Sequence, residues 1–177
     1  MLLAALLEGP QHGYALKKQA GLISGQTDMH NNLVYPLLRR FVAHGWVTRK
    51  KAAGQRGQTR QVYVLTAAGR KSIVDRVCDL DEKAVASGDE FRLRVGLFSI
   101  LNSTQRLTIL DRRQTYLLRR AQRFEPLKKA MNLGEYGGAV ILFIEQQIQN
   151  ELAWIHKLRR RDLRPGKVIG KPVGGKP

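Results

Sequence analysis

The hydrophobic period of the chain changes from helical to strand-like between residues 42 and 61. Apolar residues recur at three- and four-residue spacing from Leu33 to Val42, which is typical of one face of an α-helix. Residues 46–48 and 61–65 are instead rich in β-branched and aromatic side chains, and a basic loop with two glycines separates them. The pattern therefore predicts a helix followed by a two-stranded hairpin.

Two shorter helical segments precede this helix. Residues 2–7 are strong helix formers that end at Gly9-Pro10, and a second segment runs from His12 to Ala20. Another helix is expected after the hairpin, because Thr66 is a favourable N-cap and apolar spacing continues to Leu80. Three helices followed by a two-stranded hairpin are the element order of a winged helix-turn-helix.

Only helical patterns follow residue 90. They predict a short helix over 91–101, a longer one that ends at Glu125-Pro126, and a last one with apolar residues from Ile141 to Leu158. We expect a mainly α protein with a small β-hairpin wing. Its predicted parts are a winged helix-turn-helix domain (1–86), a C-terminal helical dimerisation domain (90–162) and a basic, disordered tail (163–177).

The net charge of the chain is +17, and it is concentrated at the two ends. Residues 1–75 hold 11 basic and 3 acidic side chains (+8), residues 76–156 hold 12 and 10 (+2), and residues 157–177 hold 8 and 1 (+7). A surface of this kind attracts polyanions, although it also serves solubility. Nucleic acid is therefore the expected partner.

Several other classes of protein are not favoured. No apolar run is long enough to cross a membrane, and the N-terminus lacks the basic region of a secretory signal, so we expect a cytoplasmic protein with no membrane contact. The four histidines have no metal-ligand spacing, and no nucleotide-binding motif is present, so we predict no metal, no cofactor and no catalytic residue. The single cysteine, Cys78, is interpreted as an apolar filler or a redox-sensing thiol.

Three stretches of the N-terminal half carry a family resemblance: LLEGPQHGY (6–14), VYPLLRRFVAHGWV (34–47) and YVLTAAGRK (63–71). They resemble the PadR family of bacterial transcription regulators, and the C-terminal helical patterns are similar to the virulence-activator-like branch of that family. The resemblance implies a regulator, often a repressor, whose affinity for DNA responds to a small molecule.

The interpretation of residues 1–86 as a winged helix-turn-helix predicts which residues contact DNA. The helix near Asn32 would enter the major groove, and the glycine-bearing loop would approach the backbone. Burial of the ring is as well supported as DNA contact for Tyr14 and Tyr35. For Arg39 the alternative to DNA contact is a position on a solvated helix face. The expected DNA contacts are Tyr14, Asn31, Asn32, Tyr35, Arg39, Arg40, Arg49, Lys51, Arg56, Gln58 and Arg60.

The last helix is expected to make the protein a homodimer. Its apolar stripe would pack against a second chain, against the 107–124 helix of its own chain, or against both. The predicted dimer contacts are Ile141, Ile144, Ile148, Leu152 and Ile155. A candidate effector pocket at that interface would be lined by Tyr136, Phe143 and Trp154. The alternatives to a sequence-specific regulator are a nonspecific nucleic-acid binder and a protein-interaction adaptor.

Overall fold

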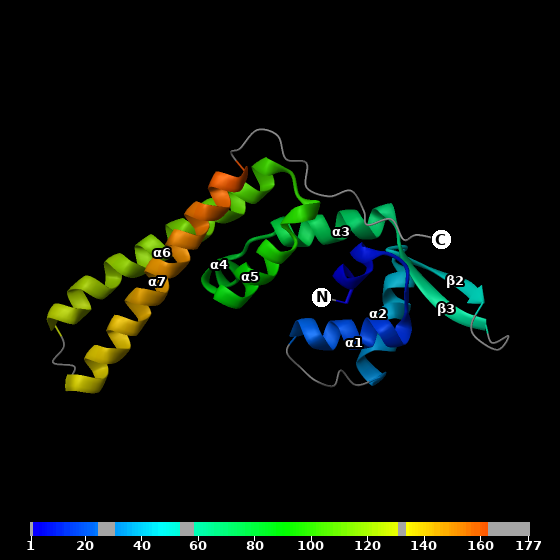
Figure 1. Ribbon diagram of the computed structural model, residues 1–177, viewed down its shortest axis with the longest axis horizontal. Helices are drawn as coiled ribbons and strands as arrows, with labels where there is room; N and C mark the ends of the chain where they lie inside the picture. The colour runs from blue at the N-terminus through cyan, green and yellow to red at the C-terminus, as the bar shows by residue number, and fades with distance from the viewer. Residues whose placement is uncertain (1, 25–30, 54–58, 131–133, 163–177) are drawn as a thin grey trace. The chain divides into compact units, whose positions relative to one another are not determined.

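A computed structural model describes residues 2–24, 31–53, 59–130 and 134–162 (Figure 1). The chain divides after Val77 into two compact units, and each is described by itself. The expected mainly helical fold with a small antiparallel sheet is confirmed. No helix in the described ranges is long and apolar enough to cross a bilayer.

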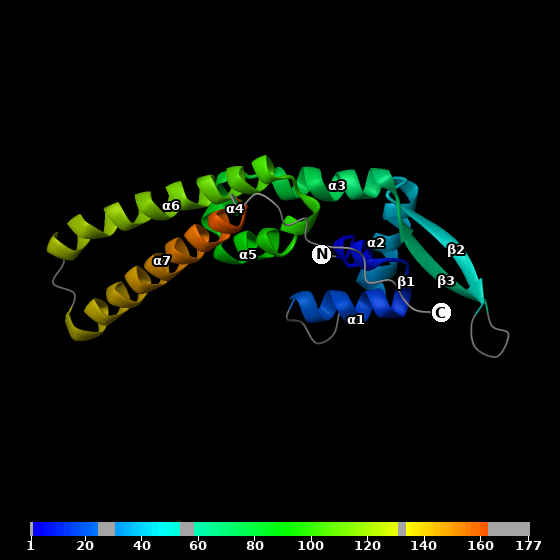
Figure 2. The ribbon, with the colours of Figure 1, turned by 45° about the horizontal axis from the view of Figure 1, so that its top comes forward.

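The first unit is built from short helices and one sheet. Its elements are η1 (Ala4–Glu8), β1 (Gln11–His12), α1 (Gly13–Ser24), α2 (Asn31–Ala43), β2 (Val47–Ala53), β3 (Thr59–Leu65) and α3 (Ala67–Cys78). The sheet order is β1-β3-β2, and both pairings are antiparallel. Figure 2 shows β2 and β3 as a long hairpin beside the helices. Leu6, Leu16, Val34, Leu38 and Val47 are fully buried and form the centre of this unit.

The first unit differs from the predictions in two details. The first helical segment, predicted over residues 2–7, is a 3₁₀-helix over Ala4–Glu8. The sheet also has a third strand, because Gln11 pairs with Tyr63 and His12 with Val62. A two-residue strand leaves no periodic pattern in the sequence, since its pairing depends on a partner about fifty residues away.

The wing is fastened to the helices at the end of α2. Gly45 has φ +70°, and the Trp46 N–H donates to the Phe41 carbonyl at 2.9 Å, which is the left-handed cap typical of helix C-termini. The Thr66 hydroxyl donates to the Gly45 carbonyl at 2.7 Å and accepts from the Gly69 N–H at 3.0 Å. Thr66 therefore caps α3, as the sequence predicted, and joins it to the end of α2.

The second unit is entirely helical in the described ranges. It contains α4 (Glu82–Ala86), α5 (Gly88–Gly96), η3 (Phe98–Ile100), α6 (Ser103–Ala130) and α7 (Gly134–Asp162). Helices α6 and α7 lie side by side as a long hairpin in both ribbon views (Figures 1 and 2). Buried apolar side chains from both helices fill the space between them and the shorter helices: Ile109, Leu110, Leu117, Ile148, Leu152 and Ile155.

Helix boundaries in this unit differ from the sequence predictions. The helix that follows the wing ends at Cys78, and the Asp81 and Ser87 side chains cap two further short helices. Helix α6 continues past Pro126 to Ala130 instead of ending there. A proline removes only one backbone hydrogen bond, and a helix that packs along a neighbour can continue through it.

Candidate DNA interface

Helix α2 presents one apolar face to the core and one polar face outward. Val34 and Leu38, one turn apart, are fully buried. Tyr35 is 42% exposed, and Arg39, four residues later, is exposed on the same face. Arg40 is exposed as well. The predicted division of this helix between core and outward residues is therefore present.

The hairpin places its cations according to strand alternation. Arg49 is paired with Tyr63 and Lys51 with Gln61, so these four side chains lie on one face of the sheet. Val47 belongs to the same face and is fully buried, so the cations extend that face beyond the core. Lys50, which is paired with Val62, lies on the opposite face.

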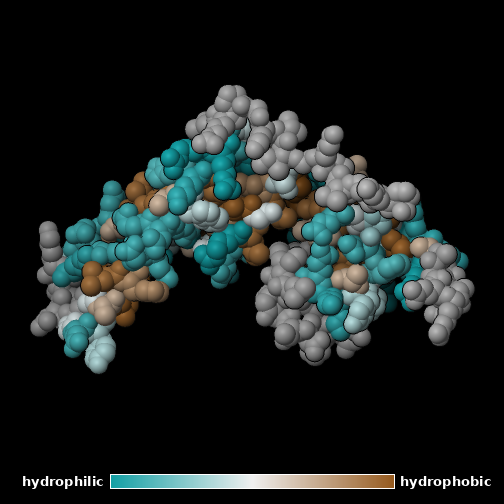
Figure 3. Space-filling model, in the orientation of Figure 1, coloured by the Kyte–Doolittle hydropathy of each residue, from teal (hydrophilic) through white to brown (hydrophobic). Residues whose placement is uncertain are grey.

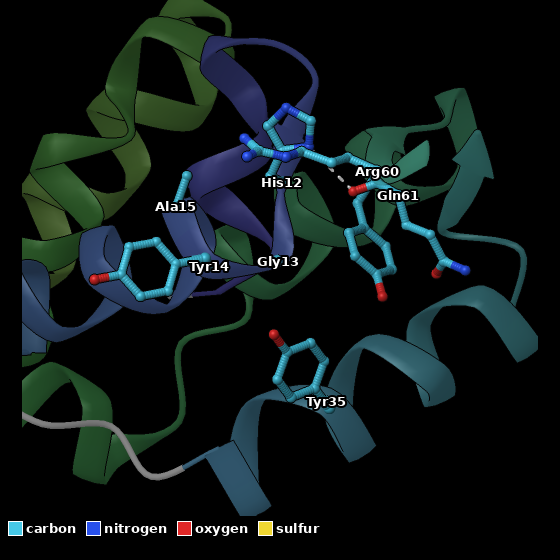
Figure 4. A pocket seen from close by; sticks show the side chains of 8 residues that line it. His12, Gly13, Tyr14, Ala15, Tyr35, Arg60 and Gln61 are labelled. Carbon is cyan, nitrogen blue, oxygen red and sulfur yellow. Dashed lines mark hydrogen bonds between the residues drawn. The ribbon is translucent and has the colours of Figure 1, made fainter. Parts of the chain in front are cut away.

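A hollow of about 500 Å³ lies between α1, α2 and β3. Figure 4 shows Tyr35 on α2 facing the start of α1, with Arg60 and Gln61 on β3 and with Tyr14 extending away. The ring of His12 donates from Nδ1 to the Gln61 carbonyl at 3.2 Å. The residues that line the hollow are His12, Gly13, Tyr14, Ala15, Tyr35, Arg60, Gln61 and Tyr63. Sequence reasoning missed His12, Gln61 and Tyr63 as site residues.

The predicted DNA contacts have different outcomes. The structure brings Tyr14, Tyr35 and Arg60 to one hollow and leaves Arg39, Arg40, Arg49 and Lys51 exposed beside it on α2 and β2. Tyr14 is 74% exposed, so its ring is not buried between helices. Arg56 and Gln58 lie outside the described residues, as do the side chains of Asn31 and Asn32.

The C-terminal predictions are altered by burial within the chain. Ile148, Leu152 and Ile155, expected to meet a second chain, are already buried in this one, which is the intrachain alternative. Ile141 and Ile144 are half-buried. The exposed large apolar side chains of α7 are instead Tyr136, Val140, Leu142 and Phe143. Figure 3 shows hydrophobic surface over this end of the helix.

Within the single chain, the three aromatic residues of the candidate effector pocket do not line one hollow. Tyr136 and Trp154 are 18 residues apart on one helix, which corresponds to about 27 Å. Trp154 packs edge-on against Phe91 at 5.7 Å and lines a different hollow of about 430 Å³ with residues of α5, α6 and α7. Tyr136 and Phe143 are 85% and 62% exposed and do not line it.

Within the described ranges, no group of three or more His, Cys, Asp or Glu side chains is placed to hold a metal ion. Cys78 is half-buried at the end of α3.

An outward-facing helix beside a cationic hairpin is the arrangement with which winged helix-turn-helix regulators approach duplex DNA. Residues 2–75 match the transcriptional regulator PadR-like family. The PadR-like resemblance inferred for this segment from the sequence is thereby confirmed.

Several solved structures are similar to the chain. A protein of Thermoplasma acidophilum described as a transcriptional regulator is 32% identical over 42% of this chain and 71% of its own, with a TM-score of 0.39. Bacillus subtilis PadR, solved in complex with operator DNA, is 20% identical over 91% and 94%, with a TM-score of 0.43. H. salinarum RosR is 28% identical over 55% and 83%, with a TM-score of 0.39. No curated protein matches the chain.

Proposed function

We propose that this PadR-like regulator binds duplex DNA in a sequence-specific manner. Helix α2 would read base edges in the major groove, and the β2–β3 hairpin would hold the backbone. The observation that carries the proposal is the set of exposed cations on these elements: Arg39, Arg40, Arg49, Lys51 and Arg60. None of them is paired with a carboxylate among the described residues. An unpaired cationic surface of this shape suits the phosphates of DNA.

The test is selection of bound duplexes from a random-sequence pool, followed by competition between the selected duplex and random DNA. A sequence-specific regulator prefers its selected duplex by about 10³-fold or more. Equal competition by random DNA would instead favour a nonspecific nucleic-acid binder. The adaptor alternative requires that replacing Arg39, Arg56 and Arg60 by Ala leaves the binding of a protein partner intact.

We further propose that the regulator acts as a homodimer through the exposed stripe of α7. Tyr136, Val140 and Phe143 follow one another at spacings of four and three residues, so they lie on one face of the helix. The three side chains are 57–85% exposed, and a second copy of the same stripe would remove them from water. Two heads held together in this way would bind two half-sites of a palindrome.

Sedimentation of the full chain tests this interface. Phe143→Glu should give monomers at concentrations where the unmodified chain is a dimer, because it places a charge in the centre of the contact. Gln149→Glu, which also introduces a carboxylate on an exposed position of α7 but on a different face of the helix from the stripe, is the matched control. A Phe143→Glu chain that remains dimeric would exclude this face.

Repression and a response to a small molecule complete the proposal. A reporter gene placed behind the selected duplex should be less active when the protein is present, and increased activity would show an activator instead. The hollow beside Trp154 is the place we propose for an effector. Since the chain has two tryptophans, the Trp46→Phe variant makes Trp154 the sole fluorescent reporter of binding there.

A further inference from the structure

We propose that the hollow between α1, α2 and β3 binds one phosphate group of the DNA backbone, with the Tyr63 hydroxyl as an anchoring donor. This inference rests on the proposed DNA binding and assigns a role to a residue that the sequence did not single out. It is carried by three features of the hollow: the start of a helix, a buried tyrosine with an available hydroxyl, and the absence of acidic groups from the lining.

Helix α1 begins at the hollow. Gly13 is its first residue, and Gly13, Tyr14 and Ala15 all line the hollow. The first backbone N–H groups of a helix have no partner within the helix and carry partial positive charge, which favours an anion. A Cβ atom at Gly13 would lie 3.1 Å from Tyr35 Cε1 and 3.5 Å from Tyr63 Cε2, so glycine allows both rings to approach the helix start closely.

Tyr63 supplies the second, independent feature. Its side chain lines the hollow and the residue is only 8% exposed. None of the described residues forms a hydrogen bond with its hydroxyl. The hydroxyl oxygen is not among the described buried side-chain atoms that lack a partner, so it reaches the open space of the hollow although most of the residue is buried. The hydroxyl is therefore available to donate to an oxygen of a molecule that enters the hollow.

The rest of the lining favours a phosphate over a cation. Arg60 supplies a positive charge and Tyr35 a second hydroxyl, and none of the eight described lining residues is acidic. The hollow is lined by Tyr35 of α2 and by three residues of β3, and these are the two elements proposed to contact DNA. A phosphodiester of the duplex would therefore be brought to it whenever α2 enters the groove, so we assign it to DNA in preference to free phosphate.

The test combines the Tyr63→Phe variant with duplexes in which single phosphates are replaced by neutral methylphosphonates. Tyr63→Phe should weaken binding of the full chain by about ten-fold, the usual effect of losing one hydrogen bond to a charged group. At one phosphate in each half-site, the methylphosphonate should weaken binding of the Tyr63→Phe variant less than it weakens binding of the unmodified chain. The reason is that the variant already lacks the contact with that phosphate. Thermal unfolding should be unchanged, since the hydroxyl has no described partner within the protein.

Two controls isolate the effect. Tyr116→Phe makes the same chemical change on α6 and should leave DNA binding unchanged. Arg39→Gln should also weaken binding. Its loss of binding free energy should add to the loss caused by the methylphosphonate at the phosphate assigned to the hollow. Inorganic phosphate should compete no better than chloride at equal ionic strength, and specific competition would assign the hollow to a free anion.

Other outcomes overturn the inference or the function separately. Unchanged affinity of Tyr63→Phe, or additive losses at every phosphate, would exclude the hollow as a phosphate site while leaving DNA binding in place. Because a phosphate contact carries no sequence information, the Tyr63→Phe loss should persist on a random duplex. A chain without sequence preference would therefore contradict the proposed function and not this site. A chain that binds no duplex would contradict both.

Discussion

The two units of the molecule use their cations in opposite ways. In the helical unit, arginines are matched to carboxylates, and four ion pairs link α6 to α7: Arg106–Asp162, Asp111–Arg159, Arg113–Glu151 and Lys128–Glu145. In the winged unit, Lys71 pairs with Asp75 on α3. The described cations Arg39, Arg40, Arg49, Lys51 and Arg60 on α2 and the hairpin have no carboxylate partner among the described residues. Charge serves folding in the helical unit and is available to an external anion in the winged unit.

Arg113 is the strongest case of the first kind. The residue is 4% exposed, and its guanidinium donates to both oxygens of Glu151 at 2.8 and 3.0 Å and to the carbonyls of Val85 and Ala86 at 2.6 and 2.9 Å. It therefore joins the end of α4 to both long helices.

Replacing this arginine is expected to give the largest effect. Arg113→Ala leaves a carboxylate and two carbonyls without partners in the interior, and it should lower the free energy of unfolding by about 3–5 kcal/mol. Arg112→Ala, at the adjacent exposed position, should change it by no more than about 0.5 kcal/mol. Urea unfolding of the full chain measures both values, and equal losses would mean that the pairing in this unit is not what stabilises it.

The hairpin cations test the other side of the comparison. Each phosphate contact that is lost should reduce the slope of log affinity against log salt by about 0.9. Arg49→Gln combined with Lys51→Gln should therefore reduce the slope by about 1.8 for each bound chain, about 3.6 for the proposed dimer, and weaken binding by at least roughly ten- to a hundred-fold in moderate salt. Thermal unfolding should stay unchanged, because neither residue has a carboxylate partner among the described ones. The Arg112→Gln variant, which removes a charge from α6, should leave the slope unaltered if the helical unit does not touch DNA.

How far the sequence predicts each unit depends on whether a feature is a local pattern or a contact between residues far apart in the chain. The outward face of α2 and the alternation of the hairpin are local patterns, so Tyr35, Arg39 and Arg49 could be placed from spacing alone. The pair of Arg113 and Glu151 joins residues 38 positions apart, and no local pattern distinguishes Arg113 from the arginine before it. The hollow was missed for the same reason, because Tyr63 meets Gly13 only after the sheet has formed.

The joint between wing and helices gives an intermediate prediction. A Cβ atom at Gly69 would overlap the Trp46 carbonyl, so Gly69→Ala should force the start of α3 away from the end of α2. We expect a loss of about 1–3 kcal/mol, as for other overpacked sites. Gly96→Ala is the matched control, because nothing lies within 4 Å of its Cβ position, and it should be neutral or slightly stabilising. Calorimetry that shows equal effects for the two variants would mean that the close approach at Gly69 is not required.

The smallest effect is expected for the pair of Lys128 and Glu145 between α6 and α7, whose side chains are 32% and 27% exposed. The hydrogen bond to Glu145 raises the pKa of Lys128 above its ordinary value of 10.5, with a smaller contribution from Glu125. Because the folded-state pKa is the higher one, the stabilisation is fully present below pH 10.5 and is lost as pH rises through the folded-state pKa. Lys128→Met should therefore unfold at a slightly lower temperature than the unmodified chain at neutral pH, and the gap should close in strong alkali. A gap that is constant with pH would show that the aliphatic part of the side chain, rather than its charge, makes the contribution.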